Sequence, residues 1–115
     1  MARGQAQDVD IVRNHTDHAA LARGVEELHG APAEWHRTVP VRLEHGNAVV
    51  WDGKVEVFAL ENHPQAAVAY AWEEPPDREG GKARIFAVLG IPPVNSATDA
   101  VRASIVQRHR ETRRN

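Results

Sequence analysis

Near its centre the chain reads Ala48-Val49-Val50-Trp51-Asp52-Gly53-Lys54-Val55-Glu56-Val57-Phe58. Two runs rich in β-branched residues flank an Asp-Gly pair, which is the sequence most typical of a two-residue type I′ turn. We therefore predict a hairpin in which residues 48–51 pair with residues 54–58. This register gives one uniformly apolar face, formed by Ala48, Val50, Val55, Val57 and Ala59. The opposite face is mixed and carries Val49, Trp51 and Phe58 beside charged residues.

A second alternating pattern lies upstream, from Trp35 to Leu43, where the odd positions are mostly apolar. It predicts a half-buried strand, and Pro40 within it predicts an edge strand, because proline has no N–H to donate to a sheet. This strand is apolar at odd positions, whereas the first strand of the hairpin is apolar at even ones, so the phase must change between them. A glycine bulge or a separate turn at Gly46-Asn47 would change it. We expect the bulge, since a turn there would leave a very short middle strand.

Further strands are expected downstream. The segment 68–72 alternates large and small residues, which predicts a strand, although an alanine-rich helix over residues 64–74 is the alternative. Residues 83–91 are apolar on both faces, which predicts a central strand covered on both sides.

Two helices complete the pattern. The first is expected from about Asp17 to His29, with Thr16 or Asn14 as its N-cap and Gly30 just after its end. The second is expected over residues 96–111, where Ser96 and Asp99 form an acidic variant of the capping box. We expect both helices to pack on one face of the sheet.

Together these elements predict an α+β fold, a twisted antiparallel sheet of four to five strands flanked by an N-terminal and a C-terminal helix. Residues 1–14 show no sustained periodicity and are expected to form a flexible lead, followed by a single domain over residues 15–115.

Composition sets limits on location. The chain has 115 residues, of which 42% are hydrophobic and 26% charged, and it contains no cysteine. Disulfides, thiolate metal sites and cysteine nucleophiles are thereby excluded. The first residues lack the apolar core of a signal peptide, and no run approaches the roughly 18 apolar residues of a membrane helix. We expect a cytoplasmic protein with no membrane partner.

The charge distribution is uneven although the net charge is only −2. Five arginines cluster near the C-terminus with Glu111 as the one acid among them: Arg102, Arg108, Arg110, Arg113 and Arg114. Such a segment can bind nucleic acid, but cations are also typical of a helix C-terminus, where they meet the negative end of the dipole. We expect no specific binding to nucleic acid.

The sequence offers few groups for catalysis. Seven histidines are present, but no HExxH motif or cysteine pair accompanies them, so we expect no metal site and no cofactor. The remaining catalytic candidates are Glu61, His63 and Glu73, which would form a histidine–carboxylate acid–base group if a cleft joined them. The alternative is that they are solvated charges at strand ends.

The sequence therefore favours a non-enzymatic interaction or ligand-binding module, and it specifies no small-molecule ligand. Two helices on one face would leave the other face of the sheet uncovered. We expect Val49, Trp51 and Phe58 to form an apolar surface there, and a homodimer to cover it. A small enzyme and a nucleic-acid-binding protein are the alternatives.

Overall fold

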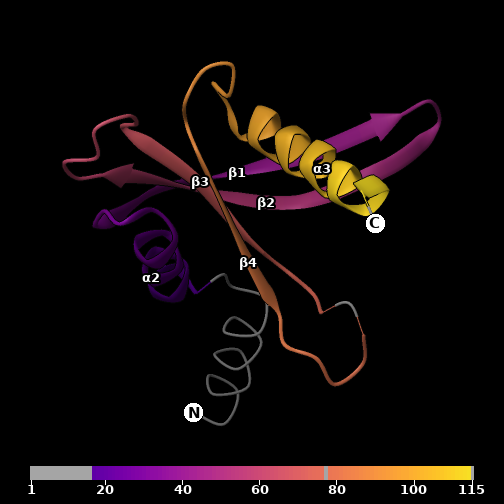
Figure 1. The fold of residues 1–115 in the computed structure, drawn as a ribbon, viewed down its shortest axis with the longest axis horizontal. Coiled ribbons are helices and arrows are strands. Elements are labelled where there is room, and N and C mark those ends of the chain that lie inside the picture. The colour runs from indigo at the N-terminus through magenta and orange to yellow at the C-terminus, as the bar shows by residue number, and fades with distance from the viewer. Residues whose placement is uncertain (1–16, 77, 115) are drawn as a thin grey trace, which may run out of the picture.

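The computed structural model describes residues 17–76 and 78–114, apart from the side chains of residues 109 and 111–114. An antiparallel sheet of four strands, in the order β1-β2-β3-β4, is preceded by one helix and followed by another (Figure 1). The predicted α+β class is confirmed, whereas the expected lead over residues 1–14 lies outside the described residues. The elements are α2 His18–His29, β1 Ala33–His45, β2 Ala48–Leu60, β3 Val68–Glu74, β4 Arg84–Leu89 and α3 Ala97–Arg114.

The two helices cover opposite faces of the sheet, so the expectation that both pack on one face is wrong. Leu21 and Val25 of α2 pack against Phe58 and its neighbours on one face. Ala100 and Val101 of α3 pack on the other face, in the cluster that contains Val55, Val57 and Trp72. Because successive strand residues point to alternate faces, β3 is buried on both sides. Because each face of the sheet carries a helix, the reason for expecting a second copy to cover a bare face no longer applies.

The central hairpin turns at Gly46-Asn47, and the predicted turn at Asp52-Gly53 is wrong. His45 pairs with Ala48, and Gly46 has the positive φ of 63° that suits glycine. Asp52 and Gly53 instead lie inside β2, opposite Arg42 and Val41. The space beside Gly53 is occupied by an indole ring, since a Cβ added there would lie 2.9 Å from a ring carbon of Trp51. This glycine makes room for a neighbouring tryptophan within the strand.

Register shifts change which side chains share a face. Leu43 pairs with Trp51 while Glu44 pairs with Val49, so Val50 forms a bulge in β2. The odd residues 37–43 of β1 and 51–57 of β2 thus share the α3 face. The face assignment predicted from an Asp-Gly turn is wrong. A second shift at His36 places Trp35 opposite Phe58, on the α2 face. Because of this bulge, Trp35 does not share the α3 face with the odd residues that follow it in β1.

The remaining strands mostly follow the sequence patterns. Residues 68–74 form β3 rather than a helix, and Pro40 lies in the edge strand β1, as predicted. The strand predicted to be central is β4, which lies at the other edge. It is apolar on both faces because Ile85 and Ala87 pack toward α2 while Phe86 and Val88 pack toward α3.

Both helices begin at side chains that cap their first turns. The N-cap of α2 is Asp17, whose carboxylate accepts from the N–H of Ala20 at 3.1 Å, in place of the predicted Thr16 or Asn14. Gly30 ends this helix in the left-handed conformation, as expected. Before α3, the hydroxyl of Ser96 accepts from the N–H of Asp99, whose carboxylate accepts from the N–H of Asn95.

Candidate functional site

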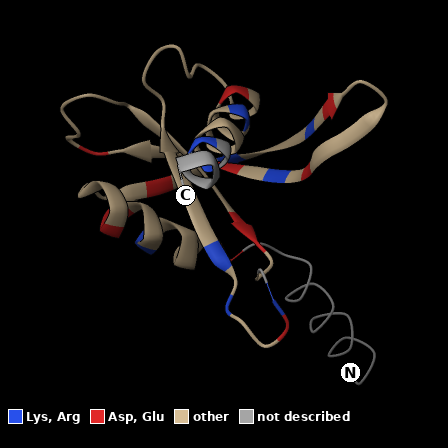
Figure 2. Cartoon of the chain, turned by 45° about the vertical axis from the view of Figure 1, so that its right-hand side comes forward, with Lys and Arg blue, Asp and Glu red and all other residues tan. Residues whose placement is uncertain are grey.

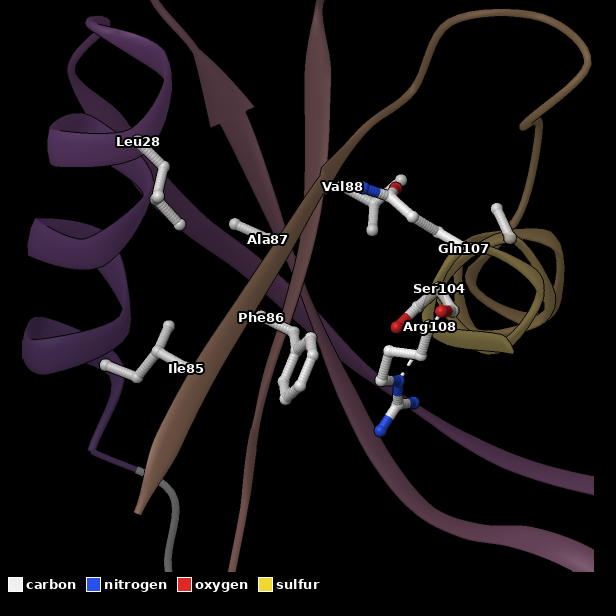
Figure 3. Close-up of a pocket in the computed structure, with 9 residues that line it drawn as sticks. Leu28, Ile85, Phe86, Ala87, Val88, Ser104, Gln107 and Arg108 are labelled. Atoms are coloured by element: carbon white, nitrogen blue, oxygen red, sulfur yellow. Dashed lines mark hydrogen bonds between the residues drawn. The ribbon is translucent and has the colours of Figure 1, made fainter. Parts of the chain in front are cut away.

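A cleft of about 290 Å³ runs along the outer edge of β4, between the two helices. Leu28 of α2 lies at one rim, and residues 85–88 of β4 form the middle (Figure 3). The other rim is formed by four residues of α3: Ala103, Ser104, Gln107 and Arg108. Every residue of β4 is partly exposed, although five of the six are apolar. Leu28 is 58% exposed and adds apolar surface at this rim. The cleft therefore presents apolar side chains together with the outer edge of β4, with which no other described strand pairs.

The backbone of β4 directs alternate residues outward. The N–H of Gly90 donates to the carbonyl of Val68 at 2.9 Å, so the even-numbered residues of this segment face β3. In an antiparallel ladder the intervening residues direct N–H and C=O to the opposite side. Ile85, Ala87 and Leu89 therefore direct their backbone groups away from β3, although the carbonyl of Leu89 already accepts from the N–H of Ile91 at 2.9 Å.

One side chain already occupies this edge. His29, in the last turn of α2, brings Nε2 within 2.9 Å of the Ala87 carbonyl oxygen. A carbonyl can only accept, so the contact requires a proton on Nε2. The imidazole thus binds one of the outward backbone groups of β4, at the middle of the strand.

The two edges of the sheet differ in how they are protected. β1 carries Pro40 in its interior and several charged residues along its length: Glu34, Arg37, Arg42 and Glu44. Proline and charge are common means by which proteins prevent pairing at a strand edge. In β4 the single charge is Arg84 at the first position, and Ile85 to Leu89 are uncharged (Figure 2). Of the two edges, only that of β4 is chemically suited to pairing.

A partly buried carboxylate, Glu74, fixes the α3 side of the cleft. Glu74 accepts from the indole N–H groups of Trp51 and Trp72 at 3.1 and 2.8 Å, and from the guanidinium of Arg108 at 2.9 and 3.3 Å. Burial alone would raise the pKa of Glu74, but the indole hydrogen bonds and the charge of Arg108 together hold its pKa below the usual range.

Arg108 connects this carboxylate to the cleft wall. Its guanidinium lies 4.7 Å from the ring centre of Phe86, which also has the Arg84 guanidinium at 5.4 Å and Trp72 stacked at 5.7 Å. Phe86 lines the cleft and is therefore held in place by two cations and an aromatic ring.

A second carboxylate, that of Glu56, is fully buried and lies on the α2 face. Glu56 is 1% exposed and accepts from Trp35 Nε1 at 2.8 Å and from the Thr38 hydroxyl. His18 Nε2 lies 3.3 Å from the same oxygen, and its ring stacks on Trp35. This group therefore joins the start of α2 to β1 and β2.

The catalytic candidates from the sequence are not brought together. His63 Nδ1 accepts from the N–H groups of Gln65 and Ala66, which stabilises the β2–β3 connection that also contains Glu61. Glu73 is exposed at the opposite end of β3. Within residues 17–76 and 78–114, no group of three or more potential ligands is arranged to hold a metal ion.

The predicted interaction surface is likewise divided. Val49 is exposed near the hairpin turn, Trp51 packs toward Trp72 on the α3 face, and Phe58 is fully buried under α2. These three residues do not share a face, because the turn and the bulge at Val50 change the register from the predicted one.

Comparisons with known proteins add no name to the site. No family model, curated protein or solved structure matches the chain. In the described part of the chain, no helix is both long and apolar enough to cross a membrane.

Sequence reasoning missed His29, Glu74 and Arg108 as members of this region. The local signal for Arg108 was its place in a basic helix end, which indicated solvent. Its pairing with Glu74 depends on two residues that are far apart in sequence, so no short motif could reveal it.

Proposed function

We propose that this protein is a non-enzymatic interaction module that self-associates by pairing the outer edge of β4 with the same edge of a second copy. The observation that carries this proposal is the uncharged run from Ile85 to Leu89 on a sheet edge with which no other described strand pairs. Addition of a strand to such an edge is a common mode of protein recognition. The surface that we assign to the dimer is thus β4, in place of the one first expected around Trp51.

The surroundings of β4 support an interface more than an active site. The cleft is lined largely by apolar side chains, and its charged member, Arg108, is bound to Glu74. Catalysis of the acid–base kind needs titratable groups that converge on a cavity. A second copy would instead cover the exposed Leu28 at the rim together with the strand.

Sedimentation equilibrium from micromolar to millimolar concentration tests this proposal. We expect wild-type protein to shift from monomer to dimer, and Ala87→Pro to remain monomeric. The N–H lost in Ala87→Pro points outward, so the ladder with β3 stays intact, much as Pro40 is tolerated in β1. Ala87→Ser keeps the N–H and serves as the matched control, and circular dichroism checks that each variant is folded. A wild-type protein that is monomeric at millimolar concentration would overturn the proposal.

A further inference from the structure

The outward groups of β4 specify how two copies can meet. In an antiparallel pair, two facing residues exchange both of their N–H···O bonds only if both point toward the partner. The outward residues are Ile85, Ala87 and Leu89, and they are symmetric about Ala87. A two-fold axis through Ala87 would let the strand serve as its own partner.

On this basis, which rests on the function proposed above, we propose that the two copies join β4 to β4 in an antiparallel register centred on Ala87. We further propose that the incoming strand takes the Ala87 carbonyl from His29. The Ala87 residues of the two copies then exchange two backbone hydrogen bonds. Ile85 of each copy faces the partner's Leu89, where the N–H of Leu89 donates to the Ile85 carbonyl and extends the ladder on both sides, since the Leu89 carbonyl is bound to Ile91.

The side chains that would face each other across the two strands also favour this register. Phe86 faces the partner's Val88, an aromatic and β-branched pair of the kind that stabilises antiparallel strands. The small side chain of Ala87 lies at the two-fold axis, on the face that carries α2. Arg84 faces the partner's Gly90, so no like charges meet.

Neighbouring registers pair the strands less well. A shift that places Phe86 opposite its own copy sets Arg84 against the partner's Val88. A shift in the other direction, centred on Val88, sets Phe86 against the partner's Gly90 and leaves its ring without a cross-strand side chain. Only the register about Ala87 pairs all five uncharged residues of β4 with one another.

His29 acts as a competitor in this scheme. Its Nε2 lies 2.9 Å from the carbonyl oxygen of Ala87. The same oxygen is the acceptor that the central residue pair of the dimer needs. In the monomer the imidazole occupies the middle of an apolar edge and reduces indiscriminate pairing there. Association replaces one imidazole bond in each copy with a strand ladder, so His29 sets the concentration at which copies pair.

Disulfide cross-linking tests the register, because the chain has no cysteine of its own. Single cysteines are introduced as Phe86→Cys, Ala87→Cys and Val88→Cys, and each protein is oxidised mildly at a concentration where wild-type protein sediments as a dimer. Directly facing residues have Cα atoms about 5.5 Å apart, within the range for a disulfide, whereas diagonal neighbours lie about 7–8 Å apart. We expect rapid cross-linking of Ala87→Cys alone.

The outcomes separate the two proposals. Rapid cross-linking of Phe86→Cys or Val88→Cys instead would overturn the register while leaving self-association in place. A wild-type protein that never sediments as a dimer would overturn the proposed function itself. Cross-linking does not test self-association itself, because it is carried out only where the protein already sediments as a dimer.

Replacement of His29 tests the competition. His29→Ala should lower the dimer dissociation constant roughly tenfold, the scale expected when a competing hydrogen bond is lost from each copy. His29→Gln retains an N–H donor and is expected to stay closer to wild type. A dissociation constant that rises in His29→Ala, with the fold intact by circular dichroism, would show that the ring belongs to the interface and would overturn its role as a competitor.

Discussion

Replacing Glu74 by alanine removes the acceptor shared by two indole N–H groups and the Arg108 guanidinium. Trp72 is 1% exposed, so its N–H would remain buried without its present partner, at a cost of about 1–3 kcal/mol. Arg108 is one-third exposed and can be hydrated from the cleft, so loss of its ion pair adds only about 0.5–1 kcal/mol. We expect Glu74→Ala to lower the free energy of unfolding by about 2–4 kcal/mol.

Urea denaturation followed by far-ultraviolet circular dichroism measures this change without relying on fluorescence from the tryptophans concerned. Glu73→Ala is the matched control, because this neighbouring carboxylate is exposed and should cost less than about 0.5 kcal/mol. Glu74→Gln keeps an oxygen acceptor for the indoles and should fall between the two. If Glu74→Ala is no more destabilising than Glu73→Ala, then the carboxylate does not support the cleft wall and the reasoning is refuted.

Three further predictions concern the pH dependence of stability, Gly53 in β2 and the basic helix α3. The folded-state pKa of Glu74 is lowered, so its contribution to stability should be complete above the unfolded pKa and should be lost as pH falls through the folded pKa. Wild-type protein should therefore lose more stability on acidification than Glu74→Gln in parallel urea titrations. Gly53→Val should destabilise the fold by about 1–3 kcal/mol by displacing the Trp51 ring, and an unchanged melting temperature would contradict that packing. Electrophoretic mobility shift at physiological salt should show no sequence-specific binding of DNA or RNA, since Arg102 and Arg108 already contact acidic residues; submicromolar binding to one sequence would contradict this.

The elements that the sequence predicted well are those with a clear local period. The apolar stripe of α3, the C-terminal end of α2 and the alternation in β3 follow from residues that are close together in the sequence. The Asp52-Gly53 pair misled because its usual meaning is a turn, whereas this glycine accommodates the Trp51 ring inside a strand. Gly46-Asn47 offered the true turn, and local propensity alone does not choose between two such glycines.

No local sequence pattern could reveal the candidate site, for a different reason. Whether β4 lies at the centre or the edge depends on strand order, and an apolar strand packed between two helices has the same sequence in either place. The contact of His29 with Ala87 joins the end of one helix to a strand nearly sixty residues later. Only the fold shows that this carbonyl points outward.

Amide hydrogen exchange of β4, measured across protein concentration, tests the central claim most directly. The N–H groups of Phe86 and Val88 face β3 and should be protected at every concentration, whereas that of Ala87 faces the outer edge. We predict that protection of the Ala87 amide rises as the protein passes from monomer to dimer, while protection of Phe86 and Val88 changes little. An Ala87 amide whose exchange rate is independent of concentration, in a range where the protein associates, would contradict pairing through this edge.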